Sequence, residues 1–445
     1  MLLPKKHRES VTYAVTLSVT MSNRYFDLQE EPEDPNMKRP LNRIGAAAVI
    51  ALAAASTAVI APTAVAQTDN AAKPAKITLK PELTEEQAQV QWRKIIAAYQ
   101  EKGFDNVFEA TAHSDSMNRD IPVVVIQPHD KSKRDNAPTV YMLNGADGGE
   151  GAANWIAQSD VITYYGGNNG QFSDVDASPG IGANIVIPMA GAYSYYTDWV
   201  KEQKNLQGGG GIQKWETFLT KELPQGIEPA LKANQDKRAL AGLSMSATSV
   251  LNLAQHNPGF YDSIGSFSGC AATTTGLAPE FINITVGRGG ASIDKMWGGR
   301  NTKTARYNDP QLNAHKLKGQ QNIYISNGSG FAGPHDLLGS ERVRGNSSAS
   351  ATVIVEGGVI EAATNMCTHQ FRARTNALGI PVTYNFRPVG THQWGYWQDD
   401  MRDYWPVLVK GLGTGAEKPA EPRQSRGGDL AGSIATLTGS KPATK

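Results

Sequence analysis

The strongest constraint on the fold is a series of short apolar segments that alternate with helical ones. Seven of these segments end in Gly, Pro or Ser: VVVIQP (123–128), TVYMLNG (139–145), ANIVIPMAG (183–191), RALAGLS (238–244), YDSIGSFSG (261–269), NIYISNG (322–328) and PVTYNFRP (381–388). Amphipathic stretches lie between several of them, for example residues 215–234 and 245–257. Strands that are apolar along their whole length are buried on both faces, as are parallel strands joined by helices. The pattern predicts an α/β fold with a mostly parallel central sheet and helices on both faces.

Composition narrows the class of function. The chain has 43 Lys and Arg against 42 Asp and Glu, a net charge of +1. This balance provides no basic face for nucleic acid, so we expect no nucleic-acid partner. The two cysteines exclude a disulfide-rich scaffold and a zinc site built from cysteine alone.

Residues 37–66 have the layout of a cleavable signal peptide. Basic residues precede an uncharged apolar run over 44–60, and residues 64–66 (Ala-Val-Ala) form a small-residue cleavage site. The alternative is an uncleaved anchor, but the run is rich in alanine, which partitions weakly into lipid. We therefore expect export, with no stable membrane span after cleavage. Residues 1–36 are expected to be a non-translated or disordered extension, because translation from Met37 gives an ordinary signal peptide.

The remaining chain divides into three parts. Residues 67–106 are expected to be a lead-in, flexible over 67–80 and followed by a short helix over 84–102 that starts at Thr84. Residues 107–410 carry the strand and helix pattern and have the size of one α/β domain. Residues 411–445 contain no aromatic residue and no periodicity, which predicts a disordered tail.

A candidate nucleophile lies where one predicted strand runs into a helix. The sequence there is Gly242-Leu243-Ser244-Met245-Ser246. A strand, a G-x-S-x-small turn and a helix form the nucleophile elbow of α/β-hydrolases. The Ser244 hydroxyl would then lie at a helix N-terminus, where the N–H of Met245 can stabilise an oxyanion. Such a motif also arises by chance in a chain with 45 glycines, but the flanking strand and helix favour the elbow.

The same fold predicts where a base and an acid should lie. His392 follows the last predicted strand and precedes a last helix, which is the position of the base in the order Ser, acid, His. Two carboxylates compete for the acid. Asp336 follows the strand at 322–328, and Glu361 opens a helix. Either could orient the imidazole and stabilise its protonated form.

Taken together, the motifs resemble the antigen 85 family, the secreted mycolyltransferases of mycobacteria and corynebacteria. The matching segments fall in order along residues 107–405: SMNRDI (116–121), VYMLNG (140–145), YTDW (196–199), KWETFLTKELP (214–224), AGLSMSATSVLNLA (241–254), MWG (296–298), NDP (308–310) and GTHQWGYW (390–397).

The resemblance implies an α/β-hydrolase fold and a specific set of site residues. It implies a catalytic triad of Ser244, Glu361 and His392, and so favours Glu361 over Asp336 as the acid. It also implies an oxyanion hole formed by the N–H groups of Met245 and Ala146. The substrate-binding residues that it implies are Asn144, Asp147, Asn154, Trp155 and Trp394.

The chain departs from the family pattern at the acceptor side. Where the family has Asp-Gly-Leu-Arg, this chain has Asn144-Gly145-Ala146-Asp147. Asp147 reverses the charge of the family's arginine and cannot replace its donors. The family's cysteine near the site corresponds to Ser326. Cys270 and Cys367 are additional, and an exported chain can bridge them in a disulfide.

The resemblance implies a secreted or envelope-located acyltransferase with a serine nucleophile. Trehalose monomycolate would be the glycolipid donor, and a sugar hydroxyl of trehalose monomycolate or of cell-wall arabinan the acceptor. The chemistry requires no metal and no cofactor. One alternative is a carboxylesterase that uses water as acceptor. Another is a non-catalytic envelope-binding protein, which the intact triad disfavours.

Overall fold

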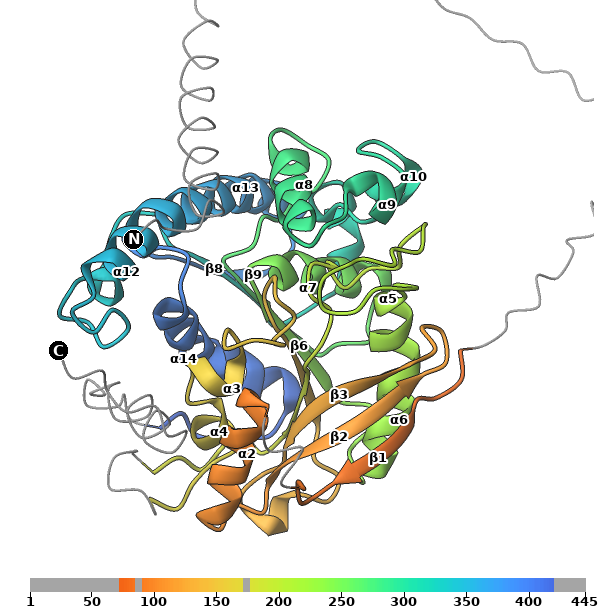
Figure 1. Cartoon of the computed structure of the whole chain (residues 1–445), viewed down its shortest axis with the longest axis vertical. Coiled ribbons are helices and arrows are strands. Elements are labelled where there is room, and N and C mark those ends of the chain that lie inside the picture. Colours follow the sequence, from red (N-terminus) through yellow and green to blue (C-terminus); the bar gives the residue numbers. More distant parts are fainter. Residues whose placement is uncertain (1–71, 85–89, 171–176, 420–445) are drawn as a thin grey trace, which may run out of the picture. The chain divides into compact units, whose positions relative to one another are not determined.

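The structure is a computed structural model that describes residues 72–84, 90–170 and 177–419. These residues form a nine-stranded sheet in the order β1-β2-β3-β5-β4-β6-β7-β8-β9 (Figure 1). The strands are β1 (Lys76–Lys80), β2 (Val107–Ser114), β3 (Arg119–Ile126), β4 (Thr139–Leu143), β5 (Asn184–Pro188), β6 (Arg238–Leu243), β7 (Ser263–Phe267), β8 (Ile323–Asn327) and β9 (Val382–Phe386). Pairing is antiparallel from β1 through β3 to β5 and parallel from β5 to β9. The expected mostly parallel sheet is confirmed.

Helices connect the strands along the described chain. They are α2 (Gln91–Glu101), α3 (Trp155–Gln158), α4 (Val161–Tyr164), α5 (Trp215–Thr217), α6 (Leu223–Ala230), α7 (Met245–His256), α8 (Ala278–Arg288), α9 (Ile293–Trp297), α10 (Lys303–Tyr307), α11 (Pro310–Asn313), α12 (Ser347–Thr352), α13 (Gly358–Ala377) and α14 (Trp394–Leu412). Shorter 3₁₀ or π turns are η2 (Lys131–Lys133), η3 (Phe218–Glu222), η4 (Ala314–Leu317), η5 (Pro334–Asp336) and η6 (Val353–Gly357).

Alternate residues of each central strand pack on opposite faces of the sheet. Leu240 of β6 packs in a cluster with Val250 of α7 and Phe371 of α13. Ala239 of the same strand packs in a second cluster with Tyr404 of α14. Successive strand side chains point to opposite faces, so both faces need an apolar cover. This is why the central strands are largely apolar.

The N-terminal edge of the sheet differs from expectation. Residues 76–80, expected to be a flexible lead-in, form β1, which pairs with β2 from Lys76 opposite His113 to Lys80 opposite Glu109. A five-residue edge strand with exposed polar side chains carries little apolar signal, so its sequence resembles a loop. The domain therefore begins before residue 107. The expected helix over 84–102 is observed as α2 from Gln91, and residues 85–89 lie outside the described residues.

At the C-terminal end of the domain, ordered structure continues beyond residue 411, where the tail was expected to begin. Helix α14 continues to Leu412, and the carbonyl oxygen of Ala416 accepts a 3.2 Å hydrogen bond from Trp405 Nε1. The expected extension (1–36), signal peptide (37–66) and tail after residue 419 lie outside the described residues. Of the helices in the described part, none is both long enough and apolar enough to cross a membrane.

Candidate active site

The turn from β6 into α7 has the geometry of a nucleophile elbow. Ser244 has φ of 56° and ψ of −121°, a strained conformation for a residue with a Cβ. A Cβ at Gly242 would lie 2.6 Å from Ser246 Oγ, so only glycine fits there. Ser246 Oγ accepts from Leu243 N at 3.0 Å and lies 3.1 Å from Leu143 O. The small residues on both sides of Ser244 therefore make the turn possible.

His392 lies between Ser244 and Glu361. Its Nε2 is 2.8 Å from Ser244 Oγ, and its Nδ1 is 2.8 Å from Glu361 Oε2. With Nδ1 protonated, the imidazole donates to the carboxylate and accepts from the serine hydroxyl. Glu361 is fully buried, and the His392 side chain is 9% exposed. This is the geometry that a serine nucleophile, a general base and an orienting acid require.

Further donors fix the Glu361 carboxylate. Its Oε1 accepts from Ser268 Oγ at 2.7 Å and from Gly328 N at 2.6 Å. Arg387 Nη2 lies 3.7 Å from the same oxygen, and Arg387 also forms an ion pair with the buried Asp400. Burial raises the pKa of Asp400 to about 7, and Arg387 opposes that shift. Glu361, Arg387 and Asp400 therefore form a buried charged network that contacts the imidazole through Glu361.

Asp336, the rival acid, does not contact the imidazole. Its carboxylate accepts hydrogen bonds from Thr391 and Gln393, the residues on either side of His392. Of the two candidates, the structure therefore brings Glu361 to His392.

The two N–H groups expected to form an oxyanion hole lie on segments beside Ser244. Met245 is the first residue of α7. A Cβ at Gly145 would lie 3.8 Å from Ser244 Cβ, so the loop after β4 runs next to the nucleophile. Ala146 is in that loop, where its carbonyl oxygen accepts from Tyr193 N at 2.7 Å.

Three of the expected substrate-binding residues are buried and form hydrogen bonds inside the protein. Asn144 is fully buried, donates to Pro188 O at 3.1 Å and accepts from Trp155 N at 3.2 Å. Asn154 is also buried and caps α3 by accepting from Ala157 N at 2.9 Å. Trp155 is fully buried and donates from Nε1 to Leu143 O at 2.9 Å. Their polar groups are used within the protein, so none of the three presents a free group to a sugar.

Asp147 and Trp394 remain partly exposed. Asp147 accepts from Gly149 N at 3.0 Å, and burial raises the pKa of its carboxyl. The Trp394 ring packs edge-on against Trp397 with centroids 5.2 Å apart, and Trp397 packs edge-on against His392 at 4.9 Å. Trp394 is therefore linked to the imidazole through one aromatic ring.

A disulfide joins Cys270, just after β7, to Cys367 in α13, with Cα atoms 5.0 Å apart. Helix α13 also carries Glu361. The bridge therefore ties the helix that contains Glu361 to the sheet, next to the strand that precedes Ser244.

Comparisons with known proteins agree with the motifs and the fold. The family model Esterase, described as "Putative esterase", matches residues 114–406. The diacylglycerol acyltransferase/mycolyltransferase Ag85A of Mycobacterium ulcerans is 30% identical over 283 residues, which are 62% of this chain and 75% of that protein. The chain belongs to the antigen 85 family.

Other members extend the match. The diacylglycerol acyltransferase/mycolyltransferase Ag85A of Mycobacterium tuberculosis (strain ATCC 25618 / H37Rv) is 29% identical over 307 residues, or 67% of this chain and 80% of that protein. The crystal structure of Mycobacterium tuberculosis MPT51 (FbpC1) aligns with a TM-score of 0.51 and 21% identity, over 67% of this chain and 96% of that chain. The structural match supports the α/β fold, and the named relatives place the chain among acyl-transferring enzymes.

Sequence reasoning missed several polar residues of this antigen 85 site. Ser268, Arg387 and Asp400 contact Glu361 directly or through one another. Arg387 is the penultimate residue of the last apolar segment, shortly before the loop of His392. A charge at the end of a strand beside a candidate base is a usable signal, whereas Ser268 and Asp400 carry none in sequence.

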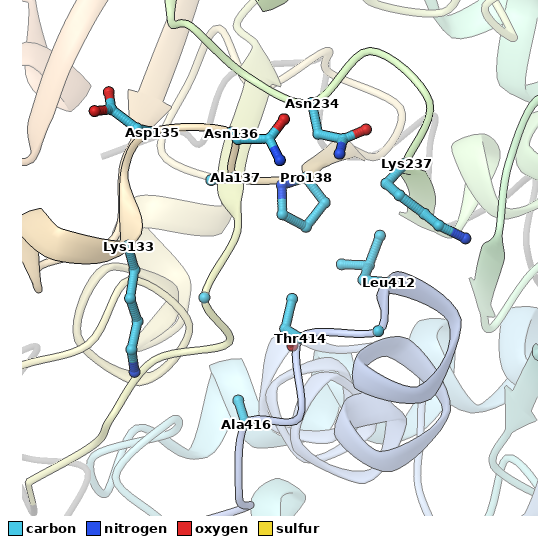
Figure 2. Close-up of a pocket in the computed structure, with 12 residues that line it drawn as sticks. Lys133, Asp135, Asn136, Ala137, Pro138, Asn234, Lys237, Leu412, Thr414 and Ala416 are labelled. Atoms are coloured by element: carbon cyan, nitrogen blue, oxygen red, sulfur yellow. The ribbon is translucent and has the colours of Figure 1, made fainter.

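A polar pocket lies away from this site. It has a volume of about 340 Å³ and is lined by Lys133, Asn136, Asn234, Lys237 and Thr414 among others (Figure 2). Part of its lining, residues within 133–138 and Asn234 with Lys237, precedes Thr139 of β4 and Arg238 of β6, so the pocket lies at the N-terminal ends of these strands. Ser244 follows the C-terminal end of β6. The pocket and Ser244 of the candidate triad therefore lie at opposite ends of the parallel strands.

Proposed function

We propose that this antigen 85 chain is an exported serine acyltransferase. It moves a mycolyl group from trehalose monomycolate to a sugar hydroxyl, on trehalose monomycolate or on cell-wall arabinan, through an acyl-enzyme on Ser244. The observation that carries this proposal is the continuous hydrogen-bonded series from Ser244 through His392 to Glu361. The names of the mycolyltransferase relatives support the substrate class.

In the acylation half, His392 Nε2 takes the hydroxyl proton as Ser244 Oγ attacks the ester carbonyl. The new Oγ–C bond forms a tetrahedral intermediate, whose oxyanion would accept from Met245 N and Ala146 N. The intermediate collapses by breaking the bond to the donor alcohol. His392 gives its proton to that alcohol, which leaves as free trehalose.

In the second half, a sugar hydroxyl attacks the acyl-enzyme and passes its proton to His392 Nε2. Breaking the Oγ–C bond returns the proton to Ser244 and releases the new ester. Glu361 supports both halves because its negative charge stabilises the imidazolium that forms each time. Nothing is oxidised or reduced, and no cofactor enters the cycle.

Apolar side chains on the segments around His392 suit a long acyl chain. We call Phe331, Val355, Val359 and Val389 the apolar rim; they are 74%, 62%, 56% and 36% exposed. Gly390 N donates to Phe331 O, and His392 N donates to Gly357 O, so these segments border the loop of the base. Exposed apolar groups gathered at one place indicate a binding surface for apolar ligands.

Hydrolysis is the alternative, with water in place of the sugar. One observation on the acceptor side favours it. Asn144, Asn154 and Trp155 are buried there, and Asp147 is a carboxylic acid where the family has an arginine. A water molecule needs no sugar pocket, so the same triad would then produce free acid.

The experiment that separates the two uses residues 67–445 and trehalose monomycolate, with Ser244→Ala as control. We expect trehalose dimycolate and free trehalose, both absent with the control. Free mycolic acid as the main product would make the enzyme a hydrolase. Turnover that persists in Ser244→Ala would refute the nucleophile.

A further inference from the structure

A second buried carboxylate lies close to the candidate triad without contacting it. Asp336 ends η5 and is fully buried. Its Oδ1 accepts hydrogen bonds from Thr391 Oγ1 and Gln393 Nε2, each 2.6 Å long. Thr391 and Gln393 are the chain neighbours of His392. One carboxylate oxygen therefore binds both residues that flank the imidazole.

The other oxygen fixes where this loop lies. Asp336 Oδ2 accepts from Gly333 N and from Tyr396 Oη, each at 2.7 Å. Tyr396 is in the first turn of α14, directly after the loop. In addition, Ser350 Oγ of α12 donates to the Asp336 carbonyl oxygen at 2.7 Å. The η5 turn, the His392 loop and α14 therefore meet at a single side chain.

The four contacts require a carboxylate. An ionised carboxylate accepts at both oxygens, whereas an asparagine amide accepts at one and donates at the other. Gly333 N–H can only donate, and Gln393 Nε2 also donates to the His335 carbonyl oxygen at 2.9 Å, a bond that the reversed amide would lose. These two donors contact different oxygens of Asp336. Either orientation of an asparagine would therefore leave one of these donors facing an NH₂ group.

We propose that Asp336 is a positioning residue for the reaction, which keeps His392 within hydrogen-bond distance of both Ser244 and Glu361. The inference rests on the proposed function, because it assigns Asp336 a part in the same serine chemistry. Both distances from the imidazole are 2.8 Å. A displacement of about 1 Å in such an arrangement costs on the order of 100-fold in rate.

The most direct test alters Thr391, since Asp336→Asn disturbs four contacts at once. Thr391→Val removes the hydroxyl and keeps the shape, and Thr391→Ser keeps the hydroxyl. Four quantities are measured: the rate at which a fluorophosphonate labels Ser244, kcat and KM on a short-chain p-nitrophenyl ester, and Tm. We expect Thr391→Val to lower the labelling rate and kcat roughly 10- to 100-fold with little change in KM. Thr391→Ser should restore both rates.

Ser350→Ala is the matched control, because it removes a hydrogen bond to the Asp336 carbonyl and leaves the carboxylate contacts intact. It should lower Tm and keep both rates. Wild-type rates in Thr391→Val would overturn the proposal, as would an equal loss of rate in Ser350→Ala. If Asp336→Asn does not fold, the two Thr391 variants still decide. A wild-type protein that the probe does not label at Ser244 would overturn the proposed function instead.

Discussion

At the scale of single residues, the environment of Glu361 explains why the proposed acid must be charged. Its Oε1 accepts from Ser268 and Gly328, and its Oε2 accepts from His392. All these groups donate to the carboxylate, and Arg387 adds a positive charge at 3.7 Å. The negative charge can therefore be kept in a fully buried position and is available to stabilise the imidazolium.

Glu361→Gln tests this role. The amide keeps the shape but loses the charge that stabilises protonated His392, so we expect kcat to fall roughly 10³- to 10⁴-fold at neutral pH. Ester turnover by the purified variant measures the effect. Glu356→Gln is the matched control, because Glu356 is an exposed carboxylate in the preceding π turn. Equal activities of the two variants would remove Glu361 from the triad.

Glu150 makes a prediction for the pH dependence of stability. Burial raises the pKa of its carboxyl to about 7, Asp147 adds to the shift, and Arg119 opposes it. Glutamate in an unfolded chain titrates near pH ~4.3. Between these values the folded protein holds a proton that the unfolded chain has released. The free energy of unfolding therefore falls as pH rises from about 4 to about 7.

In Glu150→Gln this loss is absent. We expect the Tm of the variant to gain on that of the wild type between about pH 5 and about pH 8. Thermal unfolding of both proteins across this range measures the difference. A Tm difference that does not change with pH would show that Glu150 titrates normally.

The role of a residue could be predicted where it depends on neighbours in the chain. It could not be predicted where it depends on contacts with residues that are distant in the sequence. The elbow around Ser244 depends on residues within two positions, and all of them are visible in the sequence. Asn144 and Trp155 instead bond to each other and to distant carbonyl groups inside the protein. Nothing in their local sequence separates this structural use from sugar binding.

At the scale of elements, burial also decides which strands could be predicted. Strands β4, β5, β7 and β8 are buried at every residue, and each stands out as an apolar segment. Strand β1 pairs with β2 at the sheet edge and is mostly exposed, so its Lys-Ile-Thr-Leu-Lys sequence resembles a loop. Its place depends on a partner about 30 residues away, which local pattern does not reveal.

The disulfide between two distant elements should raise the free energy of unfolding. Cys270 and Cys367 close a loop of 97 residues, so reduction frees a long part of the unfolded chain. We expect the oxidised protein to be about 2–4 kcal/mol more stable than the reduced one. Denaturant unfolding with and without dithiothreitol measures this difference. The Cys270→Ser, Cys367→Ser double variant is the control and should not respond to dithiothreitol. Equal midpoints for oxidised and reduced wild type would contradict the prediction.

At the scale of the whole molecule, the loops at the C-terminal ends of the parallel strands differ in chemistry from those at the N-terminal ends. The C-terminal ends of β6, β8 and β9 lead to Ser244, η5 and the loop of His392. The N-terminal ends of β4 and β6 lie beside the polar pocket of Figure 2. Loops at the C-terminal edge of a parallel sheet are where such folds bind ligands. The exposed apolar rim borders the loop of His392, on the edge where the chemistry is proposed.

The apolar rim therefore predicts a dependence on acyl chain length. Phe331→Ser and Val359→Asn remove apolar surface without touching the triad, so they should weaken long-chain substrates more than short-chain ones. We expect kcat/KM for a long-chain p-nitrophenyl ester to fall about tenfold, which corresponds to roughly 1.4 kcal/mol. This is no more than the free energy gained when one apolar side chain is buried. The short-chain ester should change little. Leu79→Asn is the matched control, since Leu79 is 39% exposed on β1, at the far end of the sheet order from β8 and β9. Equal losses on both esters would indicate damage to the triad. No loss on either would mean that the acyl chain lies along another surface.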